Sequence, residues 1–280
     1  MLEGPVSRLP INMNMFTNTA PRWILMWGLA VLVFGAVKLL SVRRVDPRES
    51  PTGRLLGYLL LWPGMDARTF LDASRHPAPP TRRDWALALL KTALGAALLL
   101  VVRPALSGAA PLVTGWTGLL GLVYLLHFGS FHLIALLWRR RGVDAVPLFR
   151  SPMRATSVAE FWGSRWNLAF SDLTRFFLFR PLTARLGATG ALWLSFLASG
   201  LVHDLVISIP AGAGAGLPTA YFLLQAAAIS VERQFAIGGG VRGWLFTAFV
   251  TAAPIALVFH PPFVLGVMNP FFDLLPSIWR

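Results

Sequence analysis

The sequence predicts an all-α protein: a polytopic bundle of about six to eight transmembrane helices in one integral membrane domain over residues 1–280. Of its 280 residues, 55% are hydrophobic and only 13% are charged, with a mean hydropathy of +0.62. A soluble domain carries roughly a quarter charged residues. The apolar residues also come in long blocks, and the arginines lie between the blocks. These observations exclude an ordinary soluble globular protein.

Six apolar blocks account for the predicted spans. A transmembrane helix needs about 20 predominantly apolar residues, and each block reaches or approaches that length. In chain order the six blocks are Trp23–Leu40, Trp85–Val102, Leu112–Trp138, Gly190–Ile209, Leu217–Val231 and Trp244–His260. A further block, Leu55–Trp62, is too short to cross a bilayer and ends in Pro63-Gly64, so we expect a half-helix there.

The connections between these blocks differ sharply in basic residues. The segment 41–84 holds eight arginines, 139–189 holds nine and 232–243 holds two, against one in 103–111 and none in 210–216. Simple alternation of the spans places the three rich connections on one side, which the positive-inside rule assigns to the cytoplasm. The formal net charge of +13 is then explained by loops that face anionic membrane lipids, and we expect no nucleic-acid partner.

Side chains that bind metals are few. The sequence contains no cysteine, which excludes disulfides, thiolate catalysis and cysteine-ligated metals. His127 and His132 share one predicted span, but their separation of five residues turns them to different faces of the helix. The sequence has no glycine-rich phosphate loop and no Asp/His constellation either, so we expect no metal.

The fourth predicted span carries His203 next to Asp204 at membrane depth. His203 lies 13 residues beyond Gly190, which is roughly 20 Å into the bilayer at 1.5 Å per residue. Ionisable groups at that depth are costly and indicate a function or a specific partner. Ser195, Ser199 and His203 recur every four residues and give this helix one polar face. That face fits a water-accessible chamber with a histidine general base, and it also fits a hydrogen-bonded helix–helix contact.

The cytoplasmic segment 139–189 carries an aromatic and basic stretch in which we expect amphipathic helices. Ser157 and Glu160 have the spacing of a helix-capping box. Beyond them, side chains four residues apart become neighbours on a helix surface. These pairs are Phe161 with Arg165 and Trp162 with Trp166.

Asn167 is expected to end this helix, and Ser171 or Asp172 is expected to cap a second one. An amphipathic helix at the membrane interface would explain the tryptophans and arginines, because indole rings favour that interface. It would not explain Asn167, which belongs to neither face of the helix.

Together these features resemble the membrane-bound O-acyltransferase family, specifically its wax synthase-like branch. The resemblance is carried by Phe161-Trp-Gly-Ser-Arg-Trp-Asn167 and, 36 positions after that asparagine, by His203 in Ser199-Gly-Leu-Val-His-Asp204. The segments Trp62-Pro-Gly-Met-Asp66 and His260-Pro-Pro-Phe263 also look like this branch. The chain is more compact than many members of the family, which leaves the acceptor more open than the reaction.

The resemblance implies an enzyme that transfers a fatty acyl group from acyl-CoA, its cosubstrate, to a hydroxyl, most simply that of a long-chain alcohol. It implies His203 as general base for the hydroxyl and Asn167 as the residue that positions the thioester or the histidine. It also implies an internal substrate chamber, direct transfer without an acyl-enzyme and no cofactor. We expect the coenzyme A head near Arg165, Arg175 and Arg180 on the basic side. The predicted substrate-binding residues are Arg165, Trp162, Trp166, Asp204 and Ser199.

Other interpretations stay open at this point. The acceptor hydroxyl could belong to a sterol, a diacylglycerol, a glycan or a secondary metabolite. His203 and Asp204 could relay protons in a transporter, which an internal repeat would favour, and none is evident. The protein could also be a scaffold whose aromatic helix anchors a partner. Alanine- and arginine-rich usage with few lysines is typical of GC-rich bacterial genomes, so the expected location is a bacterial inner (plasma) membrane.

Overall fold

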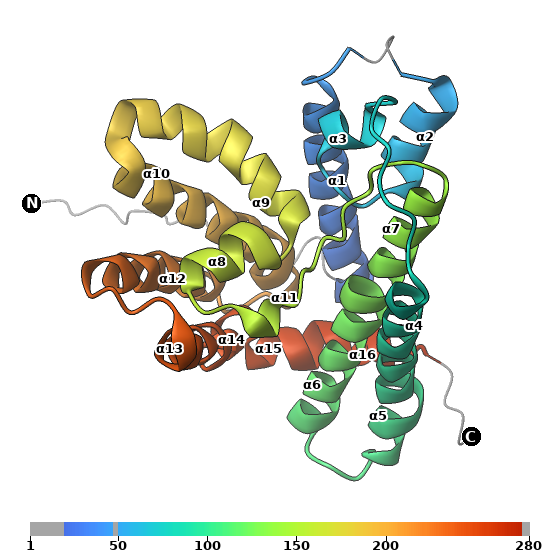
Figure 1. The fold of residues 1–280 in the computed structure, drawn as a ribbon. Helices are drawn as coiled ribbons and strands as arrows, with labels where there is room; N and C mark the ends of the chain where they lie inside the picture. The colour runs from blue at the N-terminus through green and yellow to red at the C-terminus, as the bar shows by residue number, and fades with distance from the viewer. Residues whose placement is uncertain (1–19, 47–49, 276–280) are drawn as a thin grey trace, which may run out of the picture.

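The computed structural model describes residues 20–46 and 50–275, and every regular element in these two ranges is a helix (Figure 1). This confirms the predicted all-α fold. The first half of the described chain contains α1 (Arg22–Val42), α2 (Thr52–Leu61), α3 (Ala67–Leu71), α4 (Arg82–Ala97), η3 (Leu98–Val102), α5 (Arg103–Ala105), α6 (Pro111–Leu122), η4 (Val123–Ser130) and α7 (Phe131–Arg140).

The second half begins with short helices in the predicted cytoplasmic segment and continues with longer ones. Its elements are η5 (Pro152–Arg154), α8 (Val158–Glu160), η6 (Phe161–Arg165), α9 (Leu168–Thr174), η7 (Arg175–Phe179), α10 (Arg180–His203), η8 (Asp204–Ser208), α11 (Ile209–Ala211), α12 (Leu217–Gln234), α13 (Gly240–Ala252), α14 (Ile255–Val258), α15 (Pro261–Phe263), η9 (Val264–Met268) and α16 (Asn269–Phe272).

Five helical stretches of the described chain are long and apolar enough to cross a membrane. They are Arg22–Val42, Arg82–Ala105, Pro111–Arg140, Leu168–Ala211 and Gly240–Val258. Large apolar side chains on their outer faces are exposed, among them Leu32 (70%), Leu90 (65%) and Phe249 (71%). Exposed apolar surface of this extent is stable only against lipid. The protein is therefore an integral membrane protein.

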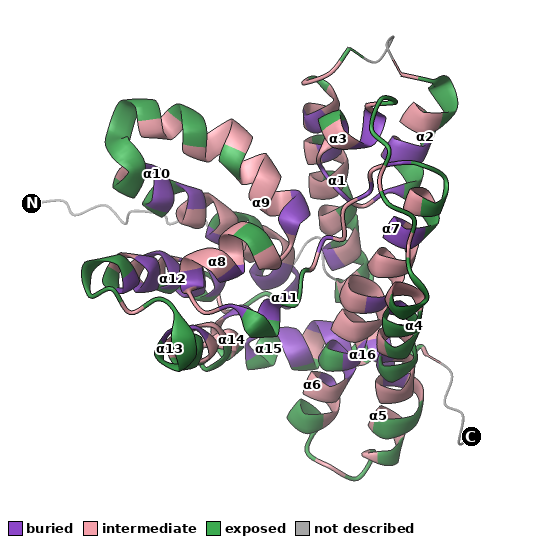
Figure 2. Ribbon diagram, in the orientation of Figure 1, coloured by how far each residue is buried: buried purple, intermediate pink, exposed green. Residues whose placement is uncertain are grey.

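The predicted span Leu217–Val231 differs from the others. It lies in α12, which is 18 residues long and is not one of the five stretches. Figure 2 shows buried residues along this helix, and they include the polar Gln225 and Glu232. A helix that packs against neighbours on much of its surface can carry polar side chains if they find partners, which lowers its mean hydropathy.

The long stretch Leu168–Ala211 is not one straight span. Inside α10, Gly187 has φ 71° and ψ 172°, a conformation that is readily available only to glycine. The chain reverses there, and Figure 1 shows α9 and the start of α10 rising to the turn and the rest of α10 returning beside them. The returning arm contains the predicted span Gly190–Ile209 together with η8 and α11.

The short apolar block forms the predicted half-helix. α2 ends at Leu61, and Trp62 is extended with φ −119° and ψ 120°. The Lys38 ammonium of α1 donates hydrogen bonds to the carbonyl oxygens of Trp62 (2.7 Å) and Gly64, and it lies 3.5 Å from the centre of the Tyr58 ring. Carbonyls outside a helix need a donor from the protein where water is scarce, and Lys38 supplies it.

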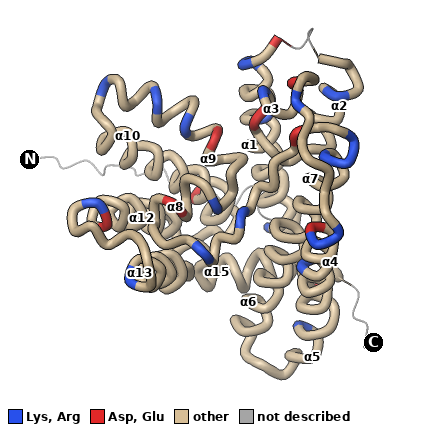
Figure 3. The backbone as a smooth tube through the Cα atoms, in the orientation of Figure 1, with Lys and Arg blue, Asp and Glu red and all other residues tan. Residues whose placement is uncertain are grey.

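Many Lys and Arg residues lie at or near helix ends, including the end of α7 with the loop after it and the facing ends of α12 and α13 (Figure 3). Several helices contain a π-helical segment in which backbone bonds run from residue i to residue i−5. In the described part these segments are η3, η4, η6, η7, η8 and η9. η6 lies in the aromatic motif, and η8 begins at Asp204, directly after His203.

Candidate active site

An extended segment, residues 142–151, runs from α7 across the molecule to the short helices that follow (Figure 1). Its backbone pairs with both sides of the aromatic motif. The Arg150 N–H donates to the Arg165 carbonyl (2.9 Å), and the Leu168 N–H donates to the Leu148 carbonyl (2.9 Å). Trp166 and Asn167 lie between these two bonds, so their backbone is fixed on both sides.

The start of the motif helix agrees in part with the predicted capping box. The Ser157 hydroxyl accepts a hydrogen bond from the Glu160 N–H (2.9 Å), as predicted. The Glu160 carboxylate does not return to Ser157. It accepts instead from the Thr156 N–H (2.7 Å) and binds Arg165. The Thr156 N–H and the Arg165 guanidinium lower the pKa of this carboxyl, although burial opposes them.

Arg165 is held by the protein itself. Its Nε (2.7 Å) and Nη2 (2.6 Å) both lie against Oε1 of Glu160. Its Nη1 donates to the carbonyl oxygens of Arg150 (3.2 Å) and Ser151 (3.4 Å). Every nitrogen of this guanidinium therefore has a protein partner. Its predicted role in substrate binding stays a prediction, and its observed contacts join the motif to the 142–151 segment.

The π-helical segment η6 changes which aromatic side chains meet. The Trp166 N–H donates to the Phe161 carbonyl (2.8 Å), a bond across five residues. The Phe161 and Trp166 rings consequently stack at 5.4 Å with an interplanar angle of 13°. The predicted pairing of Trp162 with Trp166 is wrong, because the wider turn brings residues i and i+5 together instead of i and i+4.

Asn167 ends the motif, as predicted, but it does so through its backbone. Its φ of 45° and ψ of 61° are left-handed, a conformation that asparagine tolerates better than most residues. α9 begins directly after it, so the predicted start of a second helix at Ser171 or Asp172 is wrong; both lie inside α9. Among the residues that the structure describes, none forms a hydrogen bond with the Asn167 side chain.

His203 lies at the end of α10, where it is partly buried. Its Nδ1 is 2.7 Å from the Ser199 carbonyl oxygen. Because a carbonyl oxygen can only accept, Nδ1 carries the proton in this contact, and the lone pair of the neutral ring is on Nε2. Nε2 has no hydrogen-bond partner in the described part of the chain, and it is not one of the fully buried polar atoms.

The predicted polar face of α10 exists, and its hydroxyls bond mainly within the helix. The Ser199 hydroxyl donates to the Ser195 carbonyl (3.0 Å). Ser195 is buried, and its own hydroxyl has no partner within the described residues. The substrate-binding role predicted for Ser199 remains a prediction.

Asp204 has a different environment from its neighbour His203. Its carboxylate accepts hydrogen bonds from the Ser208 hydroxyl (2.8 Å), the Gly216 N–H (2.8 Å), and the N–H (3.1 Å) and hydroxyl (2.5 Å) of Thr219. Gly216 and Thr219 form the N-terminus of α12, where a carboxylate is favourable. These four bonds hold the carboxylate in place and join the end of α10 to α12. Direct substrate binding by Asp204 remains a prediction that the contacts do not favour.

A continuous line of rings joins the aromatic motif to the histidine. The His203 imidazole lies 4.4 Å from the Phe222 ring of α12. Phe222 lies 5.5 Å from Trp162, and Trp162 lies 5.2 Å from Phe161, all between ring centres. The structure thus brings the motif and the histidine into one cluster. Their contact runs through Trp162 and Phe222, and within the described residues no hydrogen bond joins Asn167 to His203.

Trp166 faces the other side of the motif, where a second histidine lies. Trp166 packs edge-to-face on Phe149 at 5.1 Å, and Phe149 packs in the same way on His127 at 5.4 Å. The Nδ1 atom of His127 is buried without a partner in the described chain. From its sequence position, His127 is notable only as a possible metal ligand. Its proximity to the motif depends on the 142–151 segment, which carries Phe149 and has no periodic signal.

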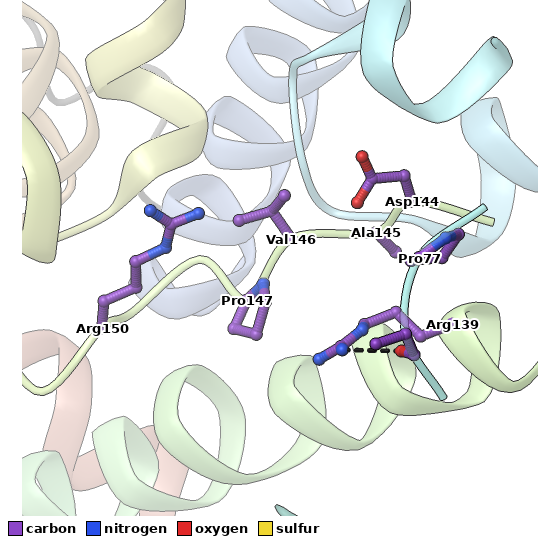
Figure 4. A pocket seen from close by; sticks show the side chains of 8 residues that line it. Pro77, Arg139, Asp144, Ala145, Val146, Pro147 and Arg150 are labelled. Atoms are coloured by element: carbon purple, nitrogen blue, oxygen red, sulfur yellow. Dashed lines mark hydrogen bonds between the residues drawn. The ribbon is translucent and has the colours of Figure 1, made fainter. Parts of the chain in front are cut away.

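Two cavities open beside the motif, and both contain arginine. The first, of about 290 Å³, lies where the 142–151 segment passes the end of α7 (Figure 4). It is lined by Pro77, Ala78, Arg139, Asp144, Ala145, Val146, Pro147 and Arg150. The second, of about 260 Å³, shares Asp144, Val146 and Arg150 with the first. Its further lining residues are Trp62, Gly64, Met65, Asp66, Thr69, Leu148, Gly163, Ser164, Leu168, Ala169, Asp172 and Arg175.

All these lining residues come from the segments 41–84 and 139–189, which the positive-inside rule places in the cytoplasm. Of the predicted arginines, Arg175 lines the second cavity and donates to the Gly163 carbonyl (3.2 Å). Arg180 lies elsewhere, over the Phe176 ring at 4.5 Å. Arg150 lines both cavities and was not predicted, because nothing in its local sequence distinguishes it from other loop arginines.

One part of the chain matches a known family. Residues 145–224 match the model described as the membrane bound O-acyl transferase family. This match includes Trp162, Asn167, His203 and Phe222, which form or adjoin the cluster described above. Over these residues the chain is similar to this family. The matched region runs from the 142–151 segment through both arms of α10 into α12.

The chain is also similar to curated proteins named as long-chain-alcohol and sterol O-acyltransferases. The protein named long-chain-alcohol O-fatty-acyltransferase of Simmondsia chinensis is 32% identical over 112 residues, which cover 36% of this chain and 32% of that protein. Probable long-chain-alcohol O-fatty-acyltransferase 9 of Arabidopsis thaliana is 37% identical over 73 residues, covering 23% and 21%. Acyl-CoA–sterol O-acyltransferase 1 of the same plant is 33% identical over 71 residues, again covering 23% and 21%.

The aligned part of the chain spans about a third or less of each of these relatives. The likeness to these relatives therefore covers only part of each protein. All three relatives are plant proteins, and they give no support to the expected bacterial membrane.

Proposed function

We propose that this protein is a membrane-bound O-acyltransferase that transfers a fatty acyl group from acyl-CoA to the hydroxyl of a long-chain alcohol. One observation carries the proposal more than any other. The Nδ1–H of His203 is bonded to the Ser199 carbonyl, so the free Nε2 is the basic nitrogen, and the ring lies against the aromatic cluster of the family motif. An imidazole oriented in this way is suited to remove a proton from a hydroxyl.

The proposed reaction is a direct acyl transfer. His203 Nε2 takes the proton of the alcohol as the alcohol oxygen forms a bond to the thioester carbonyl carbon. The carbon–sulfur bond then breaks, and the proton on Nε2 passes to the departing sulfur. The products are an ester and free coenzyme A, and His203 returns to its starting state. No acyl-enzyme is needed, and the sequence has no cysteine to form one.

We assign Asn167 to the thioester. His203 takes its orientation from Ser199 and does not need an amide to hold it. The Asn167 side chain has no partner among the described residues, and its backbone is fixed by the bonds on either side. An amide N–H held in this way can donate to the oxygen on which negative charge develops during attack, which is the role of an oxyanion-hole donor.

The two arginine-containing cavities support a place for the coenzyme A head. Its phosphates are polyanionic and water-soluble, so they belong on the basic side of the membrane. Arg150 and Arg175 line the cavity beside Gly163 and Ser164 of the motif, whereas Arg165 is already bound to Glu160. We therefore assign the head-group contact to Arg150 and Arg175 in preference to Arg165.

A sterol is the second candidate acceptor. The relative named acyl-CoA–sterol O-acyltransferase 1 resembles this chain about as closely, over a region of similar length, as those named for long-chain alcohols. The chemistry at His203 and Asn167 is the same for both acceptors. The difference would lie in the shape of the apolar space that receives the acceptor.

Incubation of the purified protein with labelled acyl-CoA and a panel of lipid alcohols, followed by mass analysis of the products, tests the proposal. We expect an ester with a long-chain alcohol and release of free coenzyme A. An ester with a sterol alone would assign the second acceptor. Absence of any ester from an intact, folded preparation, with proton flux in proteoliposomes without acyl-CoA, would replace the enzyme with the transporter.

A further inference from the structure

We propose that α12 is the element that sets the aromatic motif in register with His203, and that Gln225 and Glu232 are positioning residues for the acyl transfer. The inference rests on the proposed function for its consequences in catalysis, but the contacts themselves do not depend on it. Gln225 and Glu232 lie just beyond the segment that matches the family model, residues 145–224. Neither residue was singled out by its sequence pattern.

Gln225 binds the motif through Trp162. The side chain of Gln225 is fully buried, with 0% exposed. Its Oε1 accepts a hydrogen bond from the Trp162 indole N–H (3.2 Å), and its Nε2 donates to the Val250 carbonyl of α13 (2.8 Å). Burial of an amide costs free energy unless its polar atoms form hydrogen bonds. Here the amide oxygen and the amide nitrogen both do. The amide therefore fixes where the Trp162 ring lies.

Glu232 binds the motif at its first turn. Its side chain is buried, with 6% exposed, and Oε2 accepts a hydrogen bond from the Val158 N–H (2.5 Å). Val158 is the first residue of α8, where backbone N–H groups lack partners within the helix and a negative charge is favourable. α12 thus supplies an acceptor from outside to the start of the motif helix.

The other end of α12 binds the histidine segment. The N–H and hydroxyl of Thr219 donate to the Asp204 carboxylate next to His203, and the Phe222 ring lies against the His203 imidazole. Thr219, Phe222 and Gln225 are three residues apart, and Glu232 is seven beyond Gln225. These spacings place all four side chains on one face of a helix.

The reaction needs this register because its two halves come from different segments. His203 belongs to α10. Asn167 lies just beyond η6 in the same motif as Trp162, so its position depends on how the motif is held. Rate depends steeply on the relative placement of the base and the residue that stabilises the developing charge, and displacements of about 1 Å cost roughly 100-fold. α12 contacts the motif through Gln225 and Glu232, and it contacts the histidine segment through Thr219 and Phe222. It therefore restrains the placement of His203 relative to the motif.

A double-mutant cycle tests the Gln225–Trp162 bond. Gln225→Met keeps the size of the side chain and removes both polar groups, and Trp162→Phe keeps an aromatic ring and removes the indole N–H. Each single variant should lower kcat for acyl transfer by roughly tenfold, the equivalent of one hydrogen bond, with little change in KM for acyl-CoA. The double variant should be no slower than the slower single variant. Effects that multiply would overturn the proposal.

Two further variants separate positioning from general stability. Ser230→Ala is the matched control, because the Ser230 hydroxyl bonds only to the Ala226 carbonyl of its own helix; its kcat should equal that of the wild type. Glu232→Leu should lower kcat, and Glu232→Gln, which keeps an acceptor oxygen, should restore most of it. A similar loss in Ser230→Ala, or no difference between the two Glu232 variants, would contradict the assignment.

Hydrogen–deuterium exchange gives a readout that needs no activity. The amides of residues 158–166 should exchange faster in Gln225→Met and Glu232→Leu than in Ser230→Ala and the wild type. If the wild type makes no ester at all, the proposed acyl transfer fails and this measurement alone decides the inference. Equal exchange in all four proteins would show that α12 does not hold the motif.

Discussion

At the scale of single residues, the site is defined by which polar atoms the protein leaves unbonded. His203 and Asp204 are adjacent, yet the carboxylate of Asp204 accepts four hydrogen bonds from the protein, whereas Nε2 of His203 accepts none within the described chain. Arg165 and Arg150 contrast in the same way, since Arg165 is occupied by Glu160 and Arg150 lines two cavities. Residues with free polar atoms are the better candidates for contact with substrates.

Replacement of His203 tests the general base. His203→Gln keeps a polar side chain of similar size and removes the basic nitrogen, so acyl transfer should fall by roughly 10²–10⁴-fold, the usual contribution of a general base. The amount of folded, membrane-inserted protein should not change. Initial rates with labelled acyl-CoA measure the effect, with thermal unfolding as the check on folding. Turnover at the wild-type rate would remove His203 from the mechanism.

At Asn167, a glycine substitution can remove the side chain without straining the backbone, because the backbone there is left-handed. Asn167→Gly keeps that backbone conformation without strain and removes only the amide. We expect the rate to fall by roughly 10²–10³-fold, as for loss of an oxyanion-hole donor, with the unfolding temperature close to that of the wild type. Asn167→Ala should lose activity and also stability, since alanine is strained there. Full activity in the glycine variant would leave Asn167 a purely structural role.

At the scale of elements, the 142–151 segment links the predicted coenzyme A contacts to the motif. It bonds to the backbone on both sides of Trp166 and Asn167, and it contributes Arg150 to both cavities. The proposed phosphate contact at Arg150 is therefore close along the structure to Asn167, the residue proposed to bind the thioester.

Replacement of Arg150 tests the head-group contact. Arg150→Ala should raise KM for acyl-CoA roughly tenfold, the loss expected for one charge-assisted hydrogen bond, and leave kcat nearly unchanged. High salt should reduce the advantage of the wild type, because it screens exposed charges. Arg154→Ala is the control, since Arg154 is exposed and lines neither cavity. Equal increases in both variants would indicate a general effect of surface charge.

The Glu160–Arg165–Thr156 contacts predict a pH dependence of the motif. The pKa of Glu160 is lowered in the folded protein, so its ionised form stabilises the folded motif above the unfolded carboxyl pKa of roughly 4.3. This stabilisation is lost as the pH falls through the lower, folded pKa. Proteolysis of the motif should therefore increase at acidic pH in the wild type and vary less with pH in Glu160→Gln. Identical pH profiles would mean that this carboxylate does not stabilise the motif.

At the scale of the whole molecule, the sequence predicted features that depend on local pattern and missed those that depend on distant partners. Five of the six predicted spans, the half-helix α2 and the Ser157 cap follow from hydropathy and spacing. The reversal at Gly187 lay in a segment that was predicted only as a cytoplasmic loop, and the stacking of Phe161 on Trp166 needed a π-helical turn. The bonds from α12 to Asp204, Trp162 and Val158 join residues 15 to 74 positions apart, and no local pattern predicts them.

An engineered disulfide tests this long-range arrangement directly, and the natural absence of cysteine makes the result unambiguous. A Cβ atom built on Gly238, beyond α12, would lie 3.5 Å from Cβ of Ser157 at the start of the motif, which is within the range for a disulfide. The pair Ser157→Cys and Gly238→Cys should therefore crosslink on mild oxidation, detectable as a mobility shift that a reductant reverses.

If the motif stays docked on α12 during turnover, the oxidised protein should retain the activity of its reduced form. The reduced double variant is the right reference, because loss of the Ser157 cap itself is expected to lower stability by about 1 kcal/mol. Failure to crosslink would contradict the packing of the motif against the end of α12. Efficient crosslinking with reversible loss of activity would show instead that the motif must leave α12 for the reaction to proceed, because the docked position would then be only one of two states.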